Sequence, residues 1–167
     1  MRITHRIAPC LWFDDQAETA AHFYVSIFDN AKIVKVVRYT KAGVDVHKRP
    51  PGSVMTVAFE LDGQPFTALN GGPDFSFNEA ISFQVSCASQ SEVDYYWDEL
   101  SKNGDPAAQL CGWLKDQFGV SWQIVPDILP SLLSHPDTAE RAMDAMLKMK
   151  KLDIAELHRA SHPAIAR

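Results

Sequence analysis

The chain has 167 residues, of which 46% are hydrophobic, 10% aromatic and 22% charged. This composition excludes a disordered, collagen-like or coiled-coil chain, and the length allows a globular core without a disulfide or metal staple. The formal net charge of -5 indicates no basic face, so we expect neither DNA nor RNA as a partner. No apolar run approaches the ~20 residues that cross a bilayer, and no secretory signal is visible, so we expect a cytoplasmic protein without a membrane partner.

The three cysteines are Cys10, Cys87 and Cys111, and none of them forms a C-x-x-C pair. They are too few and too scattered for a disulfide framework, and each lies among apolar or β-prone residues. The pattern predicts three small, buried free thiols in a reducing compartment.

The first half of the chain alternates strand and helix signals. Asp15 and Glu18 have the spacing of a capping box, and apolar residues then recur at helical spacing. The segment 41–52 is rich in charge, glycine and proline and predicts a loop, whereas Asp62 and Gly63 predict a tight turn. The strands expected in this half are 7–13, 32–39, 53–61 and 64–70.

The second half repeats this order. Ser89 and Glu92 form another capping signal, and the helix that follows is expected to end at Asn103 and Gly104. The strands expected here are 80–87, 109–115 and 120–125. Because strand, capped helix and hairpin recur in the same order, the chain reads as two fused copies of one module.

The segment after Pro126 changes to an amphipathic helical pattern. Asp137 and Glu140 form a third capping signal, and Asp153 is expected to start a last short helix. Between them lies an apolar stripe of Ala139, Met143, Met146, Leu147 and Met149. Such a face must pack against the sheet or against a second subunit.

The predicted fold class is therefore α+β. We expect a first βαβββ module over 1–74, a second and shorter βαβββ module over 75–126, and a helical tail over 127–167.

One set of strand positions is polar but nearly uncharged, with aromatic residues between the polar ones. A solvated sheet face carries many charged residues, whereas this set resembles the wall of a ligand pocket. The alternative is a second packing face, such as a dimer interface. The predicted ligand-binding residues are Trp12, Glu60, Asn70, Gln84, Cys111, Trp113 and Gln123.

Other kinds of site find little support in the sequence. The six histidines do not cluster at metal-ligand spacings, and no G-x-S-x-G elbow is present. Gly71 and Gly72 end a strand without opening a helix, so neither a phosphate loop nor a methyl-donor motif is found. We predict no metal and no cofactor, and we name no catalytic residue.

Several longer stretches resemble the PhnB-like branch of the vicinal oxygen chelate superfamily, which has the glyoxalase and bleomycin-resistance fold. Proteins of this branch are often described as 3-demethylubiquinone-9 3-methyltransferases. The stretches are 9–15 (PCLWFDD), 57–72 (VAFELDGQPFTALNGG), 81–85 (ISFQV) and 111–126 (CGWLKDQFGVSWQIVP). The resemblance implies paired βαβββ modules curved around a cavity, a homodimer, and a divalent metal held by about four His, Gln or Glu ligands.

Carried over by position, the resemblance places metal ligands near Ala8 and Ala80, which have no donor atom. Gln123 and the segment 67–70 are the remaining equivalents. Two of the four ligands are therefore missing, and the leading hypothesis is a metal-free, small-molecule-binding protein. The alternatives are an enzyme, either a methyltransferase or a metal-dependent lyase or dioxygenase, and an interaction protein that works through its methionine stripe.

Overall fold

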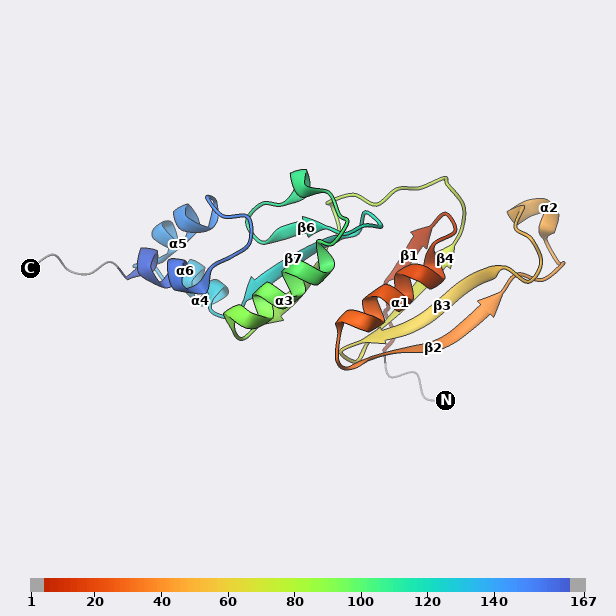
Figure 1. Cartoon of the computed structure of the whole chain (residues 1–167), viewed down its shortest axis with the longest axis horizontal. Coiled ribbons are helices and arrows are strands. Elements are labelled where there is room, and N and C mark those ends of the chain that lie inside the picture. Colours follow the sequence, from red (N-terminus) through yellow and green to blue (C-terminus); the bar gives the residue numbers. More distant parts are fainter. Residues whose placement is uncertain (1–4, 163–167) are drawn as a thin grey trace, which may run out of the picture. The chain divides into compact units, whose positions relative to one another are not determined.

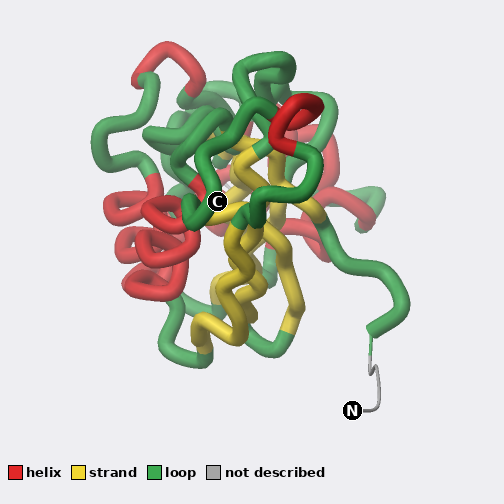
Figure 2. The backbone as a smooth tube through the Cα atoms, turned by 90° about the vertical axis from the view of Figure 1, so that its right-hand side faces the viewer, coloured by secondary structure: helices red, strands yellow, loops and turns green. Residues whose placement is uncertain are grey.

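The computed structural model describes residues 5–162 and divides the chain into two compact units (Figure 1). The first unit ends at Phe77 and the second begins at Asn78. The helices are short, as Figure 2 shows, and none in the described part of the chain is long and apolar enough to cross a membrane.

The first unit is a four-stranded sheet with one long helix against it. Its elements are β1 (Cys10–Phe13), α1 (Ala17–Ile27), β2 (Ala31–Arg38), α2 (Val44–His47), β3 (Val54–Leu61) and β4 (Gln64–Asn70). The strand order is β1-β4-β3-β2, with β1 parallel to β4 and the other pairs antiparallel. This arrangement confirms the predicted βαβββ module.

One face of this sheet packs against α1 (Figure 1). The buried residues of the helix recur at helical spacing, so they form a single apolar stripe. They are Ala17, Ala20, Ala21, Tyr24 and Ile27. On β3, Val57 and Phe59 are buried on the same side, and Tyr24 stacks on Phe59 with ring centroids 6.1 Å apart. The core of the unit therefore lies between α1 and the sheet, and the opposite face stays half-exposed.

Two local predictions for the first unit are wrong. The helix begins after Gln16, whose own side chain makes no cap hydrogen bond, so Asp15 and Glu18 form no capping box. The loop 41–52 contains a helical turn, α2, between Gly43 and Lys48, which both have positive φ. The tight turn at Asp62 and Gly63 is confirmed, because both residues adopt the left-handed conformation that a two-residue hairpin requires.

The second unit has a smaller sheet and more helices. Its elements are β5 (Phe83–Cys87), α3 (Gln90–Leu100), a 3₁₀ helix (η1, Pro106–Ala108), β6 (Trp113–Lys115), β7 (Ser121–Pro126), α4 (Leu129–Ser134), α5 (Ala139–Met146) and α6 (Ile154–Ser161). The strand order is β5-β7-β6, with β5 parallel to β7 and β6 antiparallel to it. The predicted strand 109–115 forms only over β6, because a turn at Cys111 and Gly112 occupies its first part.

The capping predictions of this unit have mixed outcomes. The Glu92 N–H donates to Ser89 Oγ at 3.2 Å, so the Ser89 cap is confirmed, whereas Glu92 Oε2 accepts from the Ala88 N–H at 2.7 Å and not from Ser89. Asp153 caps α6 by accepting from the Glu156 N–H at 2.8 Å. The third box is wrong, because α5 begins after Thr138 without a side-chain cap.

The tail packs within the second unit. The side-chain amide of Gln90 in α3 bonds to two residues of the tail. Its Nε2 donates to Leu152 O at 3.1 Å, and its Oε1 accepts from the Ile154 N–H at 2.8 Å. Its apolar cluster contains Leu129, Leu132, Ala142, Leu152 and Leu157. Met146 and Met149 pack against this cluster, whereas Met143 and Leu147 are exposed, so only part of the predicted stripe is covered.

Candidate functional site

Three of the predicted ligand-binding residues lie in one row across the second sheet. The strand register places Gln84 of β5 beside Gln123 of β7, and Gln123 beside Trp113 of β6. Residues in register point to the same side of a sheet, while their chain neighbours Val85 and Ile124 are buried on the other side. The structure therefore brings Gln84, Gln123 and Trp113 together on the face away from the buried core, hereafter the amide face.

The polar groups of the amide face form a short hydrogen-bonded chain. Gln84 Nε2 donates to Gln123 Oε1 at 3.2 Å, and Gln123 Nε2 donates to Ser82 Oγ at 2.8 Å. This leaves Gln84 Oε1 as an acceptor and the Ser82 hydroxyl hydrogen as a donor. The indole N–H of half-buried Trp113 has no hydrogen-bond partner within residues 5–162, so it adds a second donor.

A charged pair borders this row. Lys115 of β6 lies beside Ser121 of β7 in register, and its ammonium pairs with Glu79. The hydrogen bond from Lys115 lowers the pKa of the Glu79 carboxyl. Ser121 is buried, and its hydroxyl has no partner in the described part of the chain. The ion pair of Lys115 and Glu79 therefore borders the amide face on the β6 side.

Trp12 and Glu60 lie on the half-exposed face of the first sheet, where their polar groups are already paired. Trp12 Nε1 donates to Gly72 O at 2.8 Å, and its ring meets Phe75 edge-on with centroids 5.0 Å apart. The indole lies so close to Gly71 that a Cβ there would stand 2.2 Å from a ring carbon. Glu60 pairs with the exposed Lys32 at 2.8 Å. These two residues belong to the first unit, whereas the amide face belongs to the second.

Asn70 does not lie on the half-exposed face, so its predicted placement is wrong. It is 7% exposed and lies on the α1 side of the sheet, in line with Phe66 and Ala68. Its Oδ1 accepts from the Ala17 N–H at 2.8 Å, and its Nδ2 donates to Val54 O at 3.0 Å. Asn70 therefore caps α1 from a distant strand. The alternation with buried Phe66 and Ala68 was the signal that assigns it to this side.

Cys111 lies in a turn and not in a strand, which corrects its predicted place beside Trp113. It has φ +53° and precedes Gly112 with φ +84°. Its N–H donates to Met149 O at 2.8 Å, and the Gly112 N–H donates to Lys150 O at 2.7 Å. These bonds hold the turn against the tail.

The prediction of three buried thiols is also only partly correct. Cys87 is buried and Cys111 is half-buried, but Cys10 is exposed. Burial, with smaller contributions from Glu92 and Asp127, raises the pKa of Cys87 to about 12. The Cys87 thiol therefore stays protonated at neutral pH.

We expect iodoacetamide to modify Cys10 first and Cys87 only after unfolding. Only the thiolate reacts with iodoacetamide. The raised pKa lowers the thiolate fraction of Cys87, and burial hinders access of the reagent, so Cys87 should be labelled roughly a hundredfold more slowly than Cys10, or more slowly still. Peptide mapping by mass spectrometry over a time course measures both rates, and Cys10→Ser should remove the fast phase. Equal rates at Cys10 and Cys87 in the folded protein would contradict the structure.

The donor set does not fit the metal site that the resemblance implies. Ala8 and Ala80 are exposed and supply no ligand atom, and the Gln123 amide is held by Gln84 and Ser82. Within residues 5–162 no group of three or more His, Cys, Asp or Glu side chains is placed to hold a metal ion. We therefore derive no chemical step through a metal at this site.

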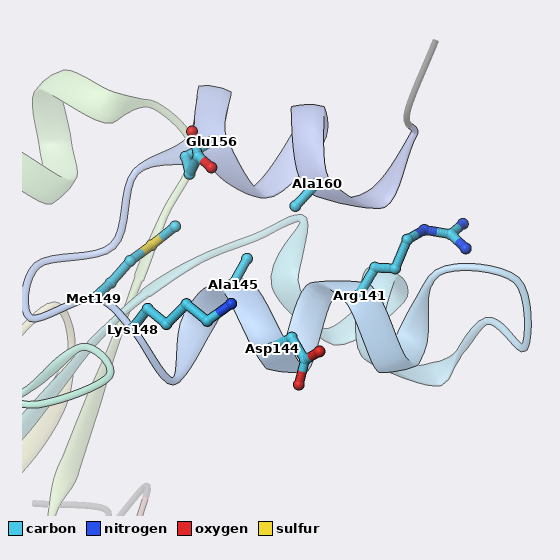
Figure 3. Close-up of a pocket in the computed structure, with 7 residues that line it drawn as sticks. All are labelled: Arg141, Asp144, Ala145, Lys148, Met149, Glu156 and Ala160. Carbon is cyan, nitrogen blue, oxygen red and sulfur yellow. The ribbon is translucent and has the colours of Figure 1, made fainter. Parts of the chain in front are cut away.

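A depression of about 410 Å³ lies between α5 and α6 (Figure 3). Ala145 and Ala160 face one another across it. Arg141 donates to Ser161 O at 2.9 Å, and Glu156 pairs with Arg159. The other lining residues are Asp144, Lys148 and Met149. Among its charged lining residues only Glu156 takes part in an ion pair within the described chain, and the depression is a polar seam between two helices.

A further cavity of about 330 Å³ lies within the first unit, where β1 and β4 end. It was missed from the sequence, although the charged loop 41–52 and the pair Gly71 and Gly72 both contribute to it. The lining residues are Asp14, Val46, His47, Lys48, Arg49, Gly71, Gly72, Pro73 and Asp74.

Comparison with known proteins gives the family. The family model of 3-demethylubiquinone-9 3-methyltransferase matches residues 5–125. A PhnB protein from Bacillus cereus is similar at 32% identity and a TM-score of 0.61, covering 73% of this chain and 99% of that chain. No match is found among curated proteins.

A more distant structure is similar in fold. A protein from Pseudomonas aeruginosa has 16% identity and a TM-score of 0.55, covering 74% of this chain and 98% of that one. The fosfomycin resistance protein FosX of Listeria monocytogenes has 16% identity and a TM-score of 0.46, covering 75% and 94%. The family match, the PhnB relative and the two small sheets agree with one another. The chain therefore belongs to the PhnB-like family of 3-demethylubiquinone-9 3-methyltransferase domains.

Proposed function

We propose that the chain binds a small molecule on the amide face of the second sheet. The observation that carries the proposal is the register row of Gln84, Gln123 and Trp113, which gathers two amides and an indole on neighbouring strands. An aromatic wall with a few placed polar groups is the usual lining of a small-molecule site.

The hydrogen bonds of the amide face favour a planar ligand with both an acceptor and a donor. The free groups are the Trp113 N–H and the Ser82 hydroxyl hydrogen, which donate, and Gln84 Oε1, which accepts. The Trp113 ring offers an apolar surface on which a flat ligand can stack. Because Gln123 bonds to both Ser82 and Gln84, it fixes the positions of the other two groups.

Methyl transfer is the second candidate, because the matching family model carries the description of a methyltransferase. That reaction would need a bound methyl donor beside the acceptor molecule. The amide face supplies hydrogen-bonding groups for an acceptor, and the same binding experiment distinguishes the two functions.

The test is a thermal-shift screen of the full chain against a small-molecule library, with S-adenosylmethionine and Mn²⁺ as separate arms. We expect planar donor–acceptor compounds to raise the Tm of the wild type. Gln123→Ala should weaken the affinity for such a compound about tenfold, since the loss of one to two hydrogen bonds costs about 1.4 kcal/mol or more. A titration of the best compound measures the change.

Gln117→Ala is the matched control, because Gln117 is an exposed glutamine in the turn between β6 and β7. It should bind like the wild type. A compound that stabilises wild type and Gln123→Ala equally would refute the proposed site. Methyl transfer would be favoured if S-adenosylmethionine raises the Tm by itself, and if other compounds raise the Tm only when S-adenosylmethionine is also present.

A further inference from the structure

The cavity at the end of the first sheet has a floor fixed by the strands. β1 and β4 are parallel neighbours, so their carboxyl ends meet at the same edge. The Gly71 and Gly72 N–H groups both donate to Phe13 O, at 2.9 and 3.4 Å, and join the two strand ends. Asp14, which follows β1, and Asp74, which follows the glycine pair, both line the space.

The wall of the cavity is the segment around α2, which is tied to the same sheet. The His47 ring lies against the Tyr39 ring with centroids 4.4 Å apart, and the Tyr39 hydroxyl donates to Asn70 O at 2.7 Å. His47 Nδ1 also accepts from the Arg49 N–H at 3.0 Å, which orients the residues after the helix. The wall is therefore held in place through Tyr39, which follows β2 and bonds to the end of β4.

Arg49 links wall and floor and retains free donors. Its Nη2 donates to both the main-chain oxygen and Oδ1 of Asp14, each at 2.7 Å, and its side chain is 21% exposed. A Cβ on Gly72 would stand 3.2 Å from Nη2, so glycine permits this close approach. Nε and Nη1 have no partner among residues 5–162, and they remain available to a ligand.

Two more charged groups line the cavity without an ion pair in the described chain. These are the Lys48 ammonium and the Asp74 carboxylate. With the Arg49–Asp14 pair already neutral, one cation and one anion remain, together with the free guanidinium donors. A simple anion would meet the Asp74 carboxylate, and a simple cation would meet Lys48, so neither matches the whole lining.

We propose that this cavity binds a small zwitterion of the free α-amino acid class. Arg49 and Lys48 hold the carboxylate through charge-assisted hydrogen bonds, and Asp74 accepts from the ammonium. The volume of about 330 Å³ is within the range of small-ligand pockets. The lining of this cavity and the amide face share no residue, so this proposal does not rest on ligand binding at the amide face.

The test uses saturation-transfer NMR of the full chain with mixtures of the common free amino acids. At least one amino acid should bind, and its N-acetyl and methyl-ester derivatives should each bind about tenfold more weakly or worse, because each has lost one charge. Failure of every amino acid to receive saturation would overturn the proposal. Equal binding of the N-acetyl form would also overturn it, since that result describes a plain anion site.

Variants assign the binding to this cavity. Lys48→Gln and Asp74→Asn should each lower the affinity about tenfold, and neither removes a recorded contact within the fold. Lys32→Gln is the control, because Lys32 is an exposed cation outside the cavity. Gln123→Ala should leave this affinity unchanged, so failure here and failure at the amide face are distinguishable. Unchanged affinity in both Lys48→Gln and Asp74→Asn would refute the assignment.

Discussion

Asp116→Ala is expected to lower the free energy of unfolding by about 3–5 kcal/mol, the largest effect we predict for a single substitution. Asp116 is 3% exposed and accepts three hydrogen bonds. Its Oδ1 accepts from the Phe118 and Val120 N–H groups at 2.8 and 3.0 Å, and its Oδ2 accepts from Trp122 Nε1 at 2.8 Å. Alanine would remove these three hydrogen bonds, and a buried donor that loses its acceptor costs about 1–3 kcal/mol.

Urea denaturation followed by circular dichroism measures the change. Asp45→Ala is the matched control, because Asp45 is an exposed aspartate on α2, and it should stay within about 0.5 kcal/mol of the wild type. Asp116→Asn should lie between the two, since it keeps one acceptor but turns a donor toward Trp122. An Asp116→Ala variant as stable as the control would show that the turn between β6 and β7 is not held by this carboxylate.

Asn70→Ala is expected to destabilise the first unit by about 2–4 kcal/mol. The side-chain amide joins the start of α1 to β3, through Ala17 and Val54, and both of these buried bonds would be lost. Ligand affinity at the amide face should not change, because the Asn70 side chain bonds to Ala17 of α1 and Val54 of β3.

Denaturation and ligand titration of the same variant separate a structural role from a binding role. Asn30→Ala is the control, because exposed Asn30 makes a single side-chain bond of 3.3 Å to Asp62, and its effect should be below about 0.5 kcal/mol. Normal stability with lost ligand affinity in Asn70→Ala would restore the sequence-based prediction that this residue binds ligand.

Sequence pattern predicted the amide face because β5 and β7 are regular strands. Successive side chains of a strand point to opposite faces, so alternation assigns Gln84 and Gln123 to one face as long as no β-bulge interrupts the strand. Which strands are neighbours was not evident from alternation, and the pairing of Trp113 with Gln123 comes from the sheet order. The βαβββ order of the first unit was predictable for the same reason, because its strands and turn residues are locally consistent.

The errors arise where distant contacts override local signals. Asp15 has the right spacing for a cap, but the Asn70 side chain reaches the first turn of α1 from another strand. Cys111 follows a β-prone pattern, yet its positive φ turns the chain toward the tail. The cavity beside α2 depends on the contact of Arg49 with Asp14, which no local pattern indicates. The expected second copy of the chain as a partner stays a prediction.

The side-chain amide NMR signals of Gln84 and Gln123 test the proposed ligand site most directly. With ¹⁵N-labelled protein and the best compound from the thermal-shift screen, we expect these two signals and the Trp113 indole signal to shift in proportion to occupancy. The Gln117 amide should not move. Shifts confined to other residues, with Gln84, Gln123 and Trp113 unchanged at saturation, would contradict ligand binding on the amide face.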